Sequence, residues 1–280
     1  MNEILLAIAM FLRTADRMVP LGEVYAALPG HANLDVDEAL HLLRETHLIR
    51  ATFQNDSVAL TPQGRAAVED GCVLDMALGL TYIGERCAPA TVHIIVRGEN
   101  QEESGGSGFF SSDYPGWLIT AAHVIAGKHI LRILDRNGTL VSAGPFEVLI
   151  APPEVDLGVV RFAGANGASS LSIEWNQQYV KHLQQLVILG YPPYPNHYPA
   201  LHHARAELHS MPKRLGSDLV SLIVASVTRP GFSGGPVLNE RGRVIGIVEQ
   251  ENITERQNQH PLAYFSATPA EYCRKIHFPD

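Results

Sequence analysis

The sequence predicts a mainly β protein in which a small α+β domain precedes a larger all-β domain. After about residue 88, short apolar runs alternate with turns rich in Gly and Pro, which is typical of a barrel or sandwich. Before residue 75, apolar residues recur at helical spacing. The 280 residues, 46% of them hydrophobic, supply enough apolar material for one small and one large core. We expect an interaction domain over residues 1–75, a connecting helix over 76–87 and an all-β domain over 88–280.

The first domain is expected to contain three helices, a hairpin and a closing helix. Helices are predicted over residues 3–14, 19–28 and 34–46, and strands over 48–53 and 57–60. Asp35 is the expected N-cap of the third helix, and Thr61 is the expected N-cap of the closing one. This order, with the run Leu60-Thr-Pro-Gln-Gly-Arg65, resembles a winged helix-turn-helix domain.

The charge of this domain bears on what it binds. Residues 1–75 hold five Arg, no Lys and eleven Asp or Glu, a formal charge of 5 − 11 = −6. The third helix, which would enter a DNA groove, begins with Asp35, Asp37 and Glu38. Phosphate contacts come mostly from Arg and Lys, so such a helix is repelled by DNA. Nucleic acid is therefore disfavoured, and a regulatory protein partner at residues 1–75 is favoured over a domain that only packs on the rest of the chain.

The compartment is predicted from the start of the chain and from the cysteines. The apolar run Met1–Leu12 contains Glu3 and no Lys or Arg, so it is read as a helix rather than a signal peptide. No apolar run approaches the roughly 18 residues that span a bilayer. Three cysteines, Cys72, Cys87 and Cys273, are too few and odd in number for a disulfide framework. These features predict a cytoplasmic protein without a membrane segment.

The segment that carries the chemistry is Thr228-Arg-Pro-Gly-Phe-Ser-Gly-Gly-Pro-Val237, which places Ser233 among glycines. Glycine permits backbone conformations closed to other residues and lets a substrate approach closely. A nucleophilic serine needs such a turn, because nearby backbone N–H groups must converge on the oxyanion of a tetrahedral intermediate. The natural donors are the N–H groups of Gly231 and Ser233. A glycine-rich turn that holds a serine is by itself an ordinary loop, so the interpretation depends on partner residues.

Two further segments supply a base and an acid. His123 follows the apolar run 116–120 and opens a turn of helix, and Asp156 stands at the head of the apolar run 157–160. Each residue alone has an ordinary structural explanation. Three such sites in the order His123, Asp156, Ser233, each in a characteristic local sequence, indicate a catalytic triad.

The region from about Ala88 to Pro269 resembles the trypsin-fold (chymotrypsin-clan) serine proteases, and most closely their bacterial HtrA/Deg-type branch. The blocks that carry the resemblance are Gly105-Gly-Ser-Gly-Phe-Phe110, Leu118-Ile-Thr-Ala-Ala-His-Val124, Asp156-Leu-Gly-Val-Val160, Leu189-Gly-Tyr-Pro192, Gly231-Phe-Ser-Gly-Gly-Pro236 and Gly242-Arg-Val-Ile-Gly-Ile247. The resemblance implies two β-barrels with the triad between them, and a serine endopeptidase that acts on polypeptides without a cofactor. One departure is Phe232, where the animal digestive enzymes have Asp.

The resemblance also implies a substrate pocket, whose expected residues are Val227, Val248, Glu249, Gln250 and Tyr264. No carboxylate falls at its expected floor, Val227, so an apolar or small residue is expected before the scissile bond. Glu249 could reverse this expectation if it turned inward.

Two further functions, metal binding and peptide binding without catalysis, also bear on the residues after 88. The histidines His197, His202, His203 and His209 match no familiar ligand spacing, so no metal is predicted. The alternative to an enzyme is a peptide-binding or regulatory module without proteolysis, or a DNA-binding regulator with a protease-like domain.

Overall fold

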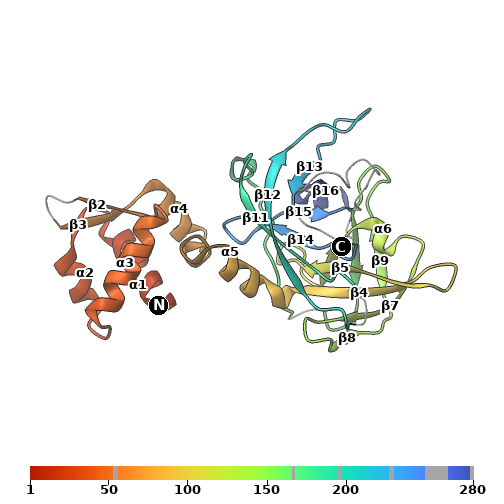
Figure 1. Cartoon of the computed structure of the whole chain (residues 1–280), viewed down its shortest axis with the longest axis horizontal. Coiled ribbons are helices and arrows are strands. Elements are labelled where there is room, and N and C mark those ends of the chain that lie inside the picture. The colour runs from red at the N-terminus through yellow and green to blue at the C-terminus, as the bar shows by residue number, and fades with distance from the viewer. Residues whose placement is uncertain (53–55, 166–167, 194–196, 227–229, 250–263, 278–280) are drawn as a thin grey trace. The chain divides into compact units, whose positions relative to one another are not determined.

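The computed structural model describes residues 1–52, 56–165, 168–193, 197–226, 230–249 and 264–277. The chain divides into two compact units, Met1–Tyr82 and Ile83–Asp280 (Figure 1). In these described ranges no helix is both long and apolar enough to span a lipid bilayer.

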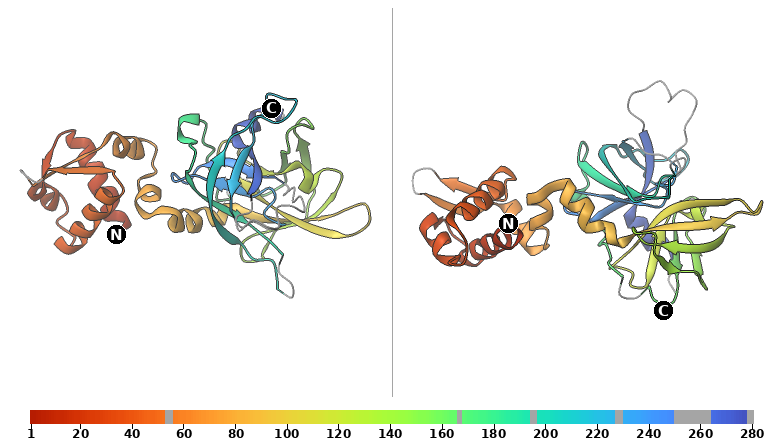
Figure 2. Two further views of the ribbon diagram at one scale, coloured as in Figure 1. Left: turned by 45° about the horizontal axis from the view of Figure 1, so that its top comes forward. Right: turned by 60° about the horizontal axis from the view of Figure 1, so that its bottom comes forward.

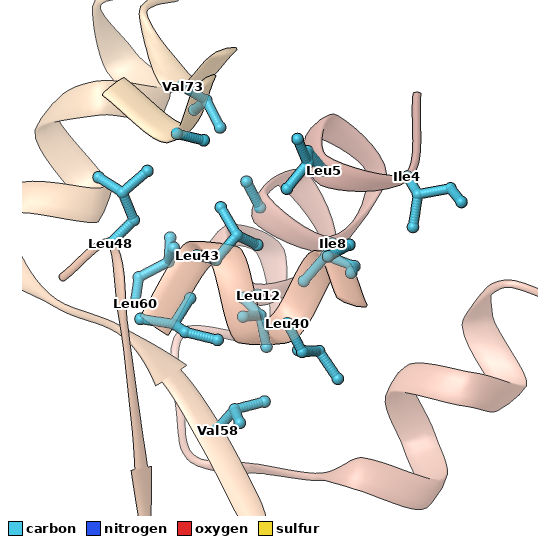
Figure 3. Close-up of a cluster of buried hydrophobic side chains, with 14 of the residues drawn as sticks. Ile4, Leu5, Ile8, Leu12, Leu40, Leu43, Leu48, Val58, Leu60 and Val73 are labelled. Carbon is cyan, nitrogen blue, oxygen red and sulfur yellow. The ribbon is translucent and has the colours of Figure 1, made fainter. Parts of the chain in front are cut away.

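The first unit is a helical core closed by a small antiparallel sheet. Its elements are α1 (Asn2–Ala15), β1 (Val19–Pro20), α2 (Leu21–Ala27), α3 (Asn33–Glu45), β2 (Ile49–Thr52), β3 (Ser57–Leu60) and α4 (Pro62–Glu69). The strands pair in the order β1-β3-β2. Leu5, Ile8 and Leu12 of α1 recur at helical spacing and are fully or almost fully buried, beside Leu43 of α3 (Figure 3). Burying one such side chain contributes about 1.5–3 kcal/mol, which holds these short helices in place.

Of the two N-caps predicted for helices of this unit, one is confirmed and the other is wrong. The Thr61 side chain accepts a hydrogen bond from the Gly64 N–H at 2.9 Å, which confirms the predicted N-cap of α4. The expected cap at Asp35 is wrong: α3 begins at Asn33, after Ala32, and Asp35 lies in its first turn. There its charge interacts favourably with the helix dipole without a capping hydrogen bond.

The expected connecting helix is interrupted. The element α5 spans Val73–Cys87, but Gly79 has φ 73° and ψ −163°, which is not helical. Leu74 and Leu78 pack at the edge of the first core, whereas Ile83 is fully buried in the second unit. The connecting helix predicted over 76–87 is therefore broken at Gly79, which permits a positive φ, and the residues on its two sides pack in different cores.

The second unit contains two groups of strands, seen apart in Figure 2. The first group follows the 3₁₀ helix η1 (Ala88–Ala90) and comprises β4 (Thr91–Arg97), β5 (Glu103–Phe110), β6 (Trp117–Thr120), β7 (His129–Leu134), β8 (Leu140–Ser142), β9 (Glu147–Ile150) and β10 (Gly158–Arg161), with the short helix α6 (Ala122–Ile125). Its strands pair in the order β8-β7-β4-β5-β6-β10-β9. Where we expected a closed barrel, the pairings among the described residues leave β8 and β9 as the two edges of a seven-stranded sheet.

The strand β5 extends over the polar residues 103–106, which pair with β4, from Arg97 opposite Glu103 to Ile94 opposite Gly106. Glu103 also pairs with Arg97 at 3.2 Å. The extension occurs because β4 is seven residues long and offers backbone partners along its whole length.

The second group of strands is a closed barrel, as predicted. It comprises β11 (Gln185–Gly190), β12 (His202–Ser210), β13 (Leu222–Ala225), β14 (Pro236–Leu238), β15 (Val244–Val248) and β16 (Tyr264–Pro269), in the order β11-β12-β13-β16-β15-β14. The 3₁₀ helices η2 (Gln177–Tyr179) and η4 (Ala270–Lys275) flank it in the chain. Its core includes Ile188, Leu208 and Val224, all fully buried, together with Phe232 from the turn before β14.

Candidate active site

His123 and Asp156 are brought together by the pairing of two strands. His123 follows β6 and lies on α6, and Asp156 immediately precedes Leu157 and β10. Strands β6 and β10 are antiparallel neighbours, with Thr120 opposite Gly158. The side chains of His123 and Asp156, which are 33 residues apart in the chain, therefore lie at the same end of this strand pair.

The two side chains form a tightly defined pair. The His123 Nδ1 atom lies 2.7 Å from Asp156 Oδ2, and the His123 backbone N–H donates to Asp156 Oδ1 at 2.9 Å. Burial by itself raises the pKa of the Asp156 carboxyl, but the hydrogen bonds from His123 and the nearby Arg214 charge outweigh it and hold the pKa below the ordinary value. The carboxylate thus stays ionised and fixes the imidazole with Nε2 directed away from it.

The turn around Ser233 is shaped by two glycines with positive φ, Gly231 at 99° and Gly234 at 84°. The Gly234 N–H donates to the Val248 carbonyl at 2.8 Å, which ties the turn to β15. In the described part of the chain, the N–H groups of Gly231 and Ser233 donate to no other group. Both expected oxyanion donors are therefore available to a ligand.

The turn lies directly against the segment that carries His123. A Cβ atom at Gly234 would lie 2.2 Å from Thr120 Oγ1 and 2.9 Å from the Ala121 nitrogen. A Cβ at Gly106 would lie 2.6 Å from Val124 Cγ1 and 3.2 Å from the Ser233 carbonyl oxygen. Glycine at these positions allows the backbones to meet at a distance that no other residue permits.

The hydroxyl of Ser233 is not bonded to the His123 ring within the ranges that the structure describes. Hydrogen bonds between a nucleophile and its base are often long in the absence of substrate. The arrangement therefore supplies a fixed base–acid pair, a half-buried hydroxyl on the adjoining turn and two N–H groups that bond to no described residue.

Ser107 connects these parts, although no role was predicted for it. Its hydroxyl donates to the Gly231 carbonyl at 2.6 Å and accepts the Tyr191 N–H at 2.9 Å, and its own N–H donates to the Ser233 carbonyl at 2.8 Å. Ser107 is fully buried. The glycines of the motif Gly105-Gly-Ser-Gly indicated an unusual backbone at this position. They did not indicate the contact of Ser107 with Gly231, which lies 124 residues later in the chain.

The structure describes three of the five residues expected in the substrate pocket. Val227 and Gln250 lie outside the described residues. Val248 is buried in β15, and the half-buried ring of Tyr264 lies 5.1 Å from that of His209. The Glu249 carboxylate contacts the Arg214 guanidinium and accepts from the Thr268 hydroxyl at 2.5 Å. Arg214, in the loop between β12 and β13, carried no signal in the sequence.

In the part of the chain that the structure describes, no three His, Cys, Asp or Glu side chains gather in a way that could hold an ion. His202 and His203 are adjacent on β12, and adjacent strand residues point to opposite faces.

Comparisons with known proteins agree with this architecture. A sequence profile described as "Trypsin-like peptidase domain" matches residues 106–247, about half of the chain. The uncharacterized protein y4bJ of Sinorhizobium fredii is 29% identical over 52% of this chain and 22% of its own length. Serine protease HTRA1 of Xenopus laevis is 26% identical over 58% of this chain and 36% of its own length. The chain thus spans only about a fifth to a third of the length of these two relatives.

Solved structures show the same fold at low sequence identity. The HtrA-type protease AlgW with a tripeptide is 19% identical, with a TM-score of 0.54 over 70% of this chain and 61% of that chain. The active form of the Rv3671c protease from M. tuberculosis is 21% identical, with a TM-score of 0.53 over 69% of this chain and 82% of that chain. The HtrA proteases are thus among the proteins to which this chain is similar, and the profile match confirms the expected peptidase domain, so the chain belongs to the trypsin-like peptidase family.

Proposed function

We propose that this chain is a serine endopeptidase in which Ser233 attacks a peptide carbonyl. His123 takes the hydroxyl proton and later passes it to the leaving amine, while Asp156 holds the imidazole tautomer and stabilises the imidazolium. The observation that carries the proposal is the His123–Asp156 pair, with contacts of 2.7 and 2.9 Å, beside a serine turn whose N–H groups are available. The oxyanion is stabilised by the N–H groups of Gly231 and Ser233.

We propose that the residue before the scissile bond is apolar or small. The Glu249 carboxylate, which could have attracted a basic side chain, is compensated by Arg214, and its side chain is only 12% exposed. A substrate Lys or Arg would have to displace this internal partner. A peptide library in which Lys or Arg dominates at that position would refute the proposed specificity.

We propose that the first unit is a winged-helix-like interaction domain through which a protein partner controls the peptidase. Asp35, Asp37 and Glu38 all lie exposed on α3, next to Leu34, which is 77% exposed. Acidic side chains beside an apolar one fit a basic and apolar protein surface better than a phosphate backbone. The partner would bind the first unit more tightly when the Ser233 turn has its catalytically competent conformation, and it would thereby favour that conformation.

The partner proposal is tested by reversing charge on the full-length chain. The variant Asp35→Lys/Asp37→Lys is expected to lose partner-stimulated peptide cleavage and to keep the activity measured without the partner. The matched control is Glu147→Lys, which changes an exposed acid in the other unit. Binding of the unaltered protein to duplex DNA at physiological salt would point instead to the DNA-binding alternative.

A cytoplasmic location is also proposed. It is supported by the cysteine count: the three cysteines, Cys72, Cys87 and Cys273, are few and odd in number, which does not fit the disulfide framework of small secreted domains. Fractionation of the producing cells checks it, and recovery of the mature protein outside the cytoplasm would contradict it.

The catalytic proposal is tested with a fluorophosphonate probe, which reacts covalently with an activated serine. The wild type is expected to be labelled, and Ser233→Ala is expected not to be. His123→Ala is expected to slow labelling by about 10³-fold or more, because it removes the base that activates the hydroxyl. Absence of labelling with and without candidate partners would favour a peptide-binding module instead.

A further inference from the structure

The peptidase unit contains a cavity of about 1,100 Å³ beside the nucleophile turn. Gly105 of β5, Pro230 and Gly231 line the part of it nearest the turn, and His93 of β4 and Tyr191 also line it. Neither Val248, Glu249 nor Tyr264 is among the described residues that line it. The cavity is therefore separate from the three described positions that were expected to bind the residue before the scissile bond.

An aromatic pair is buried at this cavity. The His93 and Tyr191 rings stack with centroids 5.2 Å apart and planes 17° from parallel. His93 is only 6% exposed, yet in the described part of the chain its ring makes no hydrogen bond to another residue. A Cβ at Gly105 would lie 2.4 Å from His93 Nε2, so the glycine leaves that nitrogen uncovered on the cavity side. Burial lowers the pKa of His93 to about 4, so the ring is neutral at pH 7.

The same pair is connected to the oxyanion turn. The Tyr191 N–H donates to Ser107 Oγ at 2.9 Å, and that hydroxyl donates to the Gly231 carbonyl at 2.6 Å. The Tyr191 hydroxyl donates to the Thr91 carbonyl at 2.9 Å, which fixes the ring. The part of the cavity wall that contains Tyr191 is therefore held in place two hydrogen bonds from Gly231.

The position of the cavity indicates which part of a substrate reaches it. The leaving amine takes its proton from His123, which the first sheet carries. The residues after the scissile bond therefore depart along that sheet. The cavity is lined by its strands β4, β5 and β7, through residues such as Ile95, Gly105 and Leu134.

We propose that this cavity is the subsite for the residue that follows the scissile bond, and that it selects a large aromatic side chain. The inference rests on the proposed endopeptidase function and names part of its substrate. Prolines, Ile95, Leu134 and the ring of Tyr198, which is 94% exposed, offer an apolar and aromatic lining. An aromatic side chain can pack on this lining, and the His93 nitrogen beside Gly105 can accept a hydrogen bond from an indole N–H or a phenol hydroxyl.

The two carboxylates at the cavity are committed to other contacts, whereas the exposed Arg136 also lines it. Glu103 pairs with Arg97 at 3.2 Å and with Arg132 at 3.9 Å. The Asp135 carboxylate accepts the N–H groups of Asn137 and Thr139, each at 2.8 Å. An aromatic occupant is thus favoured over a basic one, and the experiment includes an acidic ligand because Arg136 could attract it.

The test measures binding of product-like peptides to the Ser233→Ala protein by calorimetry, so that it does not depend on turnover. The peptides H-Trp-Ala-Ala-NH₂, H-Gly-Ala-Ala-NH₂ and H-Asp-Ala-Ala-NH₂ represent the leaving segment. The Trp peptide is expected to bind about tenfold or more tightly than the other two, which is the discrimination that a filled apolar pocket provides. Equal affinities, or tightest binding of the Asp peptide, would overturn the proposal.

Two matched Ala→Trp substitutions test whether the preference for the Trp peptide arises at this cavity. Ala200 is exposed and lines the cavity, and Ala163 is exposed and does not. Ala200→Trp, which places a bulky aromatic ring at the cavity wall, is expected to reduce the preference for the Trp peptide to about threefold or less, and Ala163→Trp is expected to keep it. A preference that survives Ala200→Trp would place aromatic binding elsewhere and refute the inference.

A labelling experiment separates this inference from the proposed function. A fluorophosphonate has no peptide on the leaving side, so its reaction with the wild-type protein tests the catalytic proposal without involving the cavity. If the wild type is not labelled, the catalytic proposal fails, while the binding experiment still decides whether the cavity holds an aromatic side chain.

Discussion

The Arg214 side chain forms an ion pair with Glu249 at the junction between the two groups of strands that carry the site. The same guanidinium donates to the Ser221 hydroxyl at 2.8 Å and to the carbonyl of Glu154 at 3.1 Å. Glu154 lies two residues before Asp156, and Glu249 follows Val248, whose carbonyl accepts the Gly234 N–H. One arginine thus holds the Asp156 segment against the strand that supports the nucleophile turn.

Removing Arg214 is expected to cost more than removing the whole ion pair. The side chains of Arg214 and Glu249 are 26% and 12% exposed, so Arg214→Ala leaves a mostly buried carboxylate unpaired. We expect a loss of about 1–3 kcal/mol in the free energy of unfolding, and a smaller loss for Arg214→Ala/Glu249→Ala. Urea denaturation of both variants measures this. A double variant that is less stable than the single one would show that the pair acts through some other contact.

His93 is expected to make the protein less stable as the pH falls. Burial lowers its pKa to about 4, whereas an exposed histidine in the unfolded chain titrates near ~6.5. Between these values the unfolded chain binds the extra proton, so the free energy of unfolding decreases from pH 6.5 towards pH 4, by at most about 3 kcal/mol. His93→Phe keeps a stacked ring and should flatten this slope in denaturation series at several pH values. The same change at His129, which is exposed, is the control and should leave the slope as it is in the wild type.

The close approach at Gly234 is expected to be essential to the site. Gly234→Ala places a methyl 2.2 Å from Ser107 O and Thr120 Oγ1, in a backbone with φ of 84°. Gly127 also has a positive φ of 67°, but no atom lies within 4 Å of its Cβ position. Gly127→Ala should therefore cost only about 1 kcal/mol of backbone strain and retain fluorophosphonate labelling. Gly234→Ala should abolish labelling, and retained labelling would mean that the turn can move away from Thr120 without loss of function.

Activation is expected not to require a new N-terminal amine ahead of the peptidase. Phe232, directly before Ser233, is 3% exposed and packs in the barrel core, where an ammonium group would find no counter-charge. We would insert a protease site before Ile83 so that cleavage exposes Ile, and in a second protein replace that residue by Gly. Labelling rates after cleavage should be equal within about twofold, because no ion pair forms with either terminus. Activation that appears only with Ile would contradict this prediction.

Phe232 can also be replaced directly. Phe232→Asp is expected to destabilise the barrel by several kcal/mol, because it buries an unpaired carboxylate. Phe232→Leu keeps an apolar side chain and serves as the control, with a much smaller loss measured by thermal unfolding. Equal unfolding temperatures for the two variants would show that residue 232 reaches solvent or an internal partner.

The sequence by itself determined the local parts of this protein. The strand before His123, the turn around Ser233 and the cap at Thr61 depend on neighbouring residues, whose backbone preferences can be read from short motifs. The alternation of short strands and turns also indicated the all-β peptidase unit.

Tertiary structure alone decided how these parts meet. The hydrogen bond of Ser107 to Gly231 spans 124 residues, and the contact of Arg214 with Glu249 spans 35. Neither pairing leaves a local pattern, because each depends on the register of β-strands that are distant in the chain. The same reason explains the open edges at β8 and β9 and the extension of β5, since strand ends are set by the partner strand that supplies hydrogen bonds. The cavity at His93 exists only because β4, β5 and β7 pair beside the segment that carries Tyr191.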